Sequence, residues 1–120
     1  MLTLEDRKSL ASIRRKARFW IVGWFRDCTN KTRHFIADQV CKRLTLGQEK
    51  YHNTWLVRDN LAEALPEALD GMMYAFFELE KGRIFAKQAQ RIAEAFLNAY
   101  FVTEQVMAER AAATKEGVQV

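Results

Sequence analysis

The sequence predicts an all-α fold, a helical bundle of about four helices. Apolar residues recur at steps of three and four along most of the 120-residue chain, and strand-like alternation is absent. One proline and five glycines interrupt the chain, so few turns are indicated. We expect a single helical domain over residues 1–113 and a disordered tail over residues 114–120.

The first helix is expected over residues 4–27. Thr3 is a suitable N-cap, and Asp6 follows three residues later in a capping-box arrangement. The helix begins basic and ends in FWIVGWF, whose large apolar side chains lie all around its circumference. One small core cannot bury all of them, so we expect a homodimer or a larger homo-oligomer.

The second helix is expected after a short connection in which Thr29 or Asn30 is the N-cap, and it should end near Leu44. Residues 45–58 are predicted to be irregular, partly because Gly47 is a helix breaker. This segment concentrates aromatic and polar side chains. Loops of this composition frequently hold ligands.

The third helix is expected over residues 59–81 and contains Pro66. An internal proline removes a backbone hydrogen bond and clashes with the preceding turn, so either the helix is kinked near Ala62–Pro66 or it begins with Pro66 in its first turn. Gly82 is expected to end it. The fourth helix is expected over residues 84–112, where apolar residues again recur at helical spacing.

Charge and composition limit the cellular setting. Residues 1–46 have a net charge of +7, and residues 47–120 have a net charge of −3. The absence of an apolar leader or a membrane-length apolar stretch, together with only two cysteines, predicts a cytoplasmic protein without a membrane partner. Duplex nucleic acid is not expected as a partner, because no helix-turn-helix, zinc or RNA-recognition signature accompanies the basic charge.

An acidic face on the third helix is the most informative feature. Glu63, Glu67 and Asp70 lie at steps of four and three residues, and with Asp59 they fall within about a quarter of the circumference. No lysine or arginine shares this face. Carboxylates at this spacing can converge on one divalent cation, but a solvated face or a basic helix as counter-charge explains the pattern equally well.

The run QEKYHNTW followed by RDNLAEALPEALDGMMYAFFELEKGR resembles the MazG-like superfamily of all-α nucleotide pyrophosphohydrolases, including its short phage-encoded members. The family combines a KYG-x-[ST]-W element with a helix that reads RDNL-x-EA-x-EE-x-x-D-x-x-x-Y. The matching residues are Lys50, Tyr51, Thr54, Trp55, Arg58, Asp59, Asn60, Leu61, Glu63, Glu67, Asp70 and Tyr74. Two positions depart from the pattern, because Pro66 replaces the second acid of the ExxE pair and His52 replaces the glycine after the tyrosine.

This resemblance implies a hydrolase that uses Mg²⁺ to release pyrophosphate from a nucleoside triphosphate. Glu63, Glu67 and Asp70 would be its metal ligands and catalytic residues. Aromatic rings would stack on the base, and cations would bind the phosphates. The residues expected to bind the nucleotide are Lys50, Tyr51, Trp55, Arg58, Arg14, Arg15 and Arg18.

Two other functions remain open. The acidic motif is incomplete, so the chain could be an inactive relative that sequesters a linear or cyclic nucleotide, as a phage counter-defence protein would. It could also be a helical module that binds another protein through FWIVGWF. His34 and His52 are isolated in the sequence, and neither is assigned a catalytic role.

Overall fold

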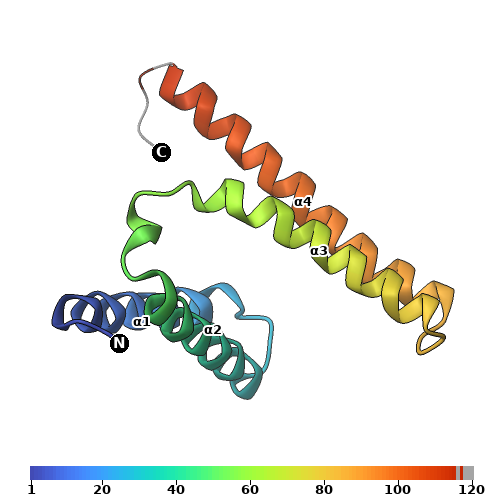
Figure 1. The fold of residues 1–120 in the computed structure, drawn as a ribbon, viewed down its shortest axis with the longest axis horizontal. Coiled ribbons are helices and arrows are strands. Elements are labelled where there is room, and N and C mark those ends of the chain that lie inside the picture. Colours follow the sequence, from blue (N-terminus) through green and yellow to red (C-terminus); the bar gives the residue numbers. More distant parts are fainter. Residues whose placement is uncertain (116, 118–120) are drawn as a thin grey trace. The chain divides into compact units, whose positions relative to one another are not determined.

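A computed structural model describes residues 1–115 and 117, and this part of the chain contains four α-helices and no β-strand (Figure 1). The helices are α1 (Leu4–Trp24), α2 (Asn30–Tyr51), α3 (Asn60–Glu80) and α4 (Ala86–Lys115), and a short 3-10 helix, η1 (Thr54–Leu56), follows α2. The predicted all-α class with four helices is confirmed. None of the described helices combines the length and the apolarity needed to cross a membrane.

The chain divides into two compact units, Met1–Arg58 and Asp59–Val120. In the first, α1 packs against α2, and in the second, α3 packs against α4. We call these units the first hairpin and the second hairpin. The single domain over residues 1–113 and the homo-oligomer both stay predictions. The helix α4 includes the first two residues of the predicted tail, and residues 116 and 118–120 lie outside the described residues.

Short-range caps define the helices of the first hairpin. The Thr3 hydroxyl accepts a hydrogen bond from the Asp6 N–H, and the Asp6 carboxylate accepts one from the Thr3 N–H, so the predicted capping box is confirmed. Thr29 caps α2, where its hydroxyl accepts from the Thr32 N–H. Where the two helices pack together, the buried apolar residues are Leu10 and Ile21 of α1 and the small residues Ala37 and Cys41 of α2.

The helix α2 is longer than predicted. It continues past Leu44 to Tyr51. The prediction that residues 45–58 are irregular is therefore wrong for residues 45–51, which are helical. A glycine inside a helix costs only about 1 kcal/mol, and the extension beyond Gly47 contains Gln48, which is buried and hydrogen-bonded to Asp6 and Asn53. The helix ends at His52, whose φ of 53° and ψ of −132° lie in a region that favours glycine.

Asp59 is the N-cap of α3, because its carboxylate accepts hydrogen bonds from the Leu61 and Ala62 N–H groups. The alternative that the helix begins with Pro66 in its first turn is therefore wrong, and this proline lies in the second helical turn. Gly82 ends the helix as predicted, with a φ of 74°. The interface between α3 and α4 is built on small buried residues, which are Ala68, Gly71, Ala75 and Ala89.

Candidate functional site

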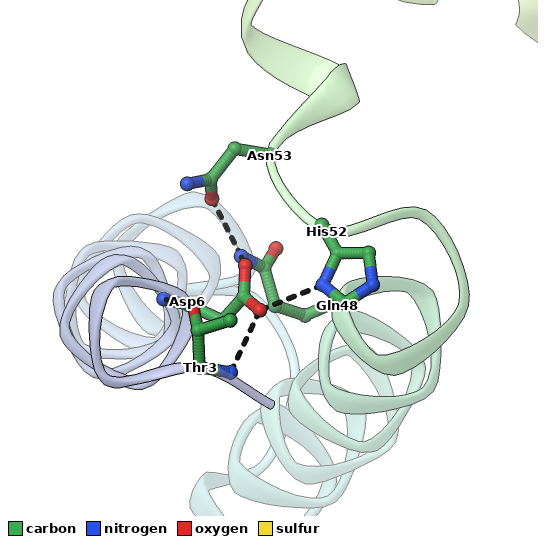
Figure 2. A network of polar contacts seen from close by, with 5 residues as sticks. All are labelled: Thr3, Asp6, Gln48, His52 and Asn53. Atoms are coloured by element: carbon green, nitrogen blue, oxygen red, sulfur yellow. Dashed lines mark hydrogen bonds and ion pairs between the residues drawn. The ribbon is translucent and has the colours of Figure 1, made fainter. Parts of the chain in front are cut away.

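A polar network joins the start of α1 to the end of α2 around the buried carboxylate of Asp6 (Figure 2). Its Oδ2 atom lies 2.9 Å from the Thr3 nitrogen and 2.6 Å from Nδ1 of His52. The Gln48 amide nitrogen lies 3.4 Å from the Asp6 Oδ1 atom and 2.6 Å from the Asn53 Oδ1 atom. This one carboxylate therefore ties the α1 cap to the residue that ends α2.

Hydrogen bonding keeps this carboxylate ionised. The Thr3 N–H and then the His52 imidazole lower the pKa of Asp6 from 3.8 to about 2, although burial acts in the opposite direction. An ionised carboxylate only accepts hydrogen bonds, so Nδ1 of His52 carries the proton in this contact. The network therefore holds His52 in place despite its unfavourable backbone conformation.

Beside the network, the first hairpin contains an open pocket of about 230 Å³. The polar side chains of Gln48 and His52 belong both to the network and to the pocket wall. Aliphatic residues of α1 and α2 line another part of the wall. The groups most able to recognise a ligand are two arginines and two aromatic rings, namely Arg43, Arg58, Tyr51 and Trp55. We call this cavity the aromatic pocket.

Two positively charged side chains lie beside the Tyr51 ring in the wall of the aromatic pocket. The Nζ atom of Lys50 lies 5.1 Å from the centroid of the Tyr51 ring, and Cζ of Arg58 lies 5.4 Å from it. Both distances are within the range of cation–π contacts. One exposed ring therefore lies close to the ends of two cationic side chains and forms part of a concave surface.

The aromatic pocket gathers three of the residues predicted to bind a nucleotide, Tyr51, Trp55 and Arg58, and Lys50 lies beside them. Arg43 is a lining residue that the sequence-based site omitted. It precedes Tyr51 by two steps of four residues and so shares its helical face. That relationship becomes visible only when α2 is extended beyond Leu44.

The arginines of α1 lie elsewhere. Arg18 donates a hydrogen bond to Asp38 of α2 at 2.5 Å, and this contact lowers the pKa of the Asp38 carboxyl. Arg14 and Arg15 are exposed on α1 and do not line the aromatic pocket. These three arginines are therefore not brought together with Tyr51, and their role in nucleotide binding stays a prediction.

The predicted metal ligands Glu63, Glu67 and Asp70 are exposed on α3. Nowhere in residues 1–115 and 117 do three or more His, Cys, Asp or Glu side chains come together as a metal site would require. These three carboxylates therefore do not form a complete Mg²⁺ ligand set by themselves, and magnesium binding stays a prediction. Asp59 has a different role, because it caps α3 and pairs with Arg110 at 2.9 Å.

The aromatic end of α1 forms a second exposed feature. The rings of Trp20 and Trp24 stack with centroids 6.0 Å apart, and Phe19 meets Trp20 edge to face at 5.5 Å. All three side chains are exposed in the first hairpin. This cluster agrees with the surplus of apolar residues noted in FWIVGWF.

Comparison with known proteins assigns no family to this chain, since no protein-family model, curated protein or solved structure matches it. The MazG-like resemblance therefore stays a prediction from the motif alone. In the first hairpin, the aromatic pocket and the Asp6 network share Gln48 and His52.

Proposed function

We propose that this protein binds a nucleotide, with the base in the aromatic pocket of the first hairpin. One observation carries the proposal: the Tyr51 ring lies within cation–π distance of both Lys50 and Arg58, in a pocket that Trp55 also lines. Aromatic rings stack on any base through their π faces, and guanidinium groups pair with phosphate oxygens. The two groups that nucleotide recognition requires are thus adjacent.

The size of the pocket supports a partly enclosed ligand. Its volume of about 230 Å³ is below the roughly 300–1,000 Å³ typical of pockets that enclose a whole drug-sized molecule. A base with its sugar suits this volume, and the phosphates would then lie outside, near the cationic side chains. None of the lining residues is an aspartate or a glutamate, so no carboxylate of the wall repels a phosphate.

Two forms of this function follow from the sequence. In the first, the protein holds the nucleotide unchanged, which agrees with the basic and aromatic character of the pocket. In the second, it is a pyrophosphohydrolase of the MazG-like type, a reading supported by the exposed acidic face of Glu63, Glu67 and Asp70. The second form requires metal ligands beyond these three carboxylates.

The proposal is tested by calorimetric titration with nucleoside triphosphates and cyclic nucleotides, each with and without Mg²⁺. Chromatography of the mixtures then distinguishes the two forms of the function. Recovery of the intact ligand identifies sequestration. A monophosphate product that requires Mg²⁺ identifies the hydrolase, and Glu67→Gln should then abolish turnover. Absence of binding by every nucleotide in the panel contradicts the proposal.

Variants of the pocket connect any binding to this site. Loss of one stacking ring costs about 1–3 kcal/mol, so Tyr51→Leu should weaken binding at least fivefold. Arg58→Gln should also weaken it, because a charge-assisted phosphate contact is lost. The matched control is Arg26→Gln, which removes an exposed charge of the first hairpin outside the pocket. Equal losses in Arg58→Gln and Arg26→Gln would place the ligand elsewhere.

A further inference from the structure

A second open cavity of the first hairpin shares two lining residues, Ile13 and Trp55, with the aromatic pocket. Its volume is about 340 Å³. The side chains that line only this cavity come from α1 and η1, and they are Lys8, Ser9, Ser12, Lys16 and Leu56. The two cavities are therefore neighbours that meet at the Trp55 side chain.

Helical spacing places the polar residues of this cavity on one face of α1. Lys8, Ser12 and Lys16 follow one another at steps of four residues, and Ser9 adjoins them. The two lysines are separated by about 12 Å along the helix axis, at 1.5 Å per residue, and the serine hydroxyls lie between them. Two flexible ammonium groups and two hydroxyls in one concavity match the donors that bind phosphate oxygens.

The charge around this cavity favours an anion. The first hairpin has 13 Lys and Arg residues against 5 Asp and Glu residues, and no carboxylate lines the cavity. Asp6, the buried acid of α1, is engaged by Thr3 and His52. Glu5 is the one acid on the cavity's face of α1, and it precedes Ser9 by one helical turn.

We propose that this second cavity is the polyphosphate subsite of a nucleoside diphosphate or triphosphate whose base occupies the aromatic pocket. The inference rests on the proposed function and narrows it to a ligand with a linear phosphate chain. A base stacked at Trp55 extends its phosphates past this shared side chain to Lys8 and Lys16. The ammonium groups neutralise phosphate charge directly, so this binding does not depend on Mg²⁺.

Two probes separate the subsites in calorimetric titrations of the full chain without Mg²⁺. Inorganic tripolyphosphate tests the second cavity alone, and free nucleosides test the aromatic pocket alone. The variant Lys8→Gln/Lys16→Gln should weaken tripolyphosphate and nucleoside triphosphate binding at least tenfold, and nucleoside affinity should stay within twofold. The converse variant Tyr51→Leu should weaken nucleosides and spare tripolyphosphate.

Matched charge changes serve as controls. Lys31→Gln/Lys42→Gln removes two exposed lysines of α2 that line neither cavity, and it should leave both affinities within about threefold. Glu5→Gln removes the one acid on the same face of α1, so it should tighten tripolyphosphate binding. Circular dichroism checks that each variant keeps its helical content.

The outcomes distinguish the inference from the proposed function. The subsite is overturned, and the proposed function stands, if nucleosides bind but tripolyphosphate does not. The same holds if nucleosides bind and tripolyphosphate binds equally well to the unmodified chain and to the Lys8→Gln/Lys16→Gln variant. If both lysine pairs weaken binding equally, the general positive charge of the hairpin accounts for it and the subsite is again overturned. If tripolyphosphate binds and no nucleoside or nucleotide does, the proposed function falls, and the nucleotide subsite falls with it.

Discussion

The Nδ1 atom of His52 lies 2.6 Å from the Oδ2 atom of Asp6, although 46 residues separate the two in the chain. The Asp6 side chain is almost fully buried, whereas half of the His52 side chain is exposed. Since His52 also lines the aromatic pocket, this contact connects the capping of α1 to the wall of the candidate site. The stability of the first hairpin and ligand binding should therefore share residues.

Acidic pH should destabilise the first hairpin, because it protonates the Asp6 carboxylate. The pKa of its carboxyl is about 2 in the folded chain and about 3.8 when unfolded, so the stabilisation is present above pH 4 and is lost as the pH falls towards 2. Asp38 contributes in the same direction, because Arg18 lowers its pKa. Urea unfolding between pH 2 and pH 7 should therefore show a falling free energy of unfolding below pH 4.

Asp6→Asn should flatten this dependence and lower the free energy of unfolding at pH 7, because the ionised acceptor of the network is gone. The matched control is Asp27→Asn, which removes an exposed carboxylate between α1 and α2. A slope below pH 4 that is the same in Asp6→Asn as in the unmodified chain would contradict this role for Asp6.

The backbone conformation of His52 predicts that a glycine variant at this position is more stable than an alanine variant. Its φ of 53° and ψ of −132° are costly for any residue with a Cβ atom, by about 1–3 kcal/mol. Both His52→Ala and His52→Gly lose the contact with Asp6, but only glycine relieves the backbone. The glycine variant should therefore be more stable than the alanine variant by about 1 kcal/mol in urea unfolding.

His34 gives the matched comparison, since it lies within α2. There, His34→Gly should be less stable than His34→Ala by about 1 kcal/mol, because glycine is a poor helix former. The same order of alanine and glycine at positions 34 and 52 would show that the His52 backbone is not strained.

Substitution of Gly47 by alanine should affect the stability of α2 and the affinity for a nucleotide in opposite directions. A Cβ atom added at Gly47 meets no other atom within 4 Å, and this residue lines the aromatic pocket. Gly47→Ala should thus stabilise α2 by about 0.5–1 kcal/mol and, by narrowing the pocket, weaken nucleotide binding several-fold. Gly23→Ala in α1 is the control, because it also adds a methyl group to open space but lies outside the pocket. Unchanged affinity in Gly47→Ala would argue against this pocket as the site.

Substitution of Gly71 by alanine should lower stability, in contrast to the same substitution at Gly47. A Cβ atom at this position of α3 would collide with the ring of Phe96 on α4. Helix propensity favours Gly71→Ala by about 1 kcal/mol, whereas overpacking costs about 1–3 kcal/mol, so we expect a net loss of stability in thermal unfolding. A stabilised Gly71→Ala variant would mean that α3 and α4 do not approach each other this closely.

The sequence was most informative where structure depends on near neighbours. The cap at Thr3 and the end of α3 at Gly82 are predicted, and the cap of α2 is narrowed to Thr29 or Asn30, because each depends on residues within a single turn. Tyr51, Trp55 and Arg58 could be grouped for the same reason, since they lie within eight residues of one another.

Contacts between distant residues were not predictable in this way. The part of α2 beyond Gly47 contains Gln48, which is buried and contacts Asp6, 42 residues earlier. The partnership of His52 with the same carboxylate has no local signal. The MazG-like pattern has a glycine where this chain has His52, the residue with a positive φ, but the pattern does not identify the residue that holds the histidine there.

Nucleotide binding in the first hairpin can be tested by titrating ¹⁵N-labelled protein with a nucleotide and observing the indole N–H signals of its three tryptophans. Trp55 lines both cavities, whereas Trp20 and Trp24 lie on the exposed aromatic end of α1 and line neither. Nucleotide binding in the aromatic pocket should produce a saturable shift of the Trp55 signal, assigned with Trp55→Phe, while the other two signals stay in place. A stationary Trp55 signal, or shifts confined to Trp20 and Trp24, would contradict nucleotide binding at this site.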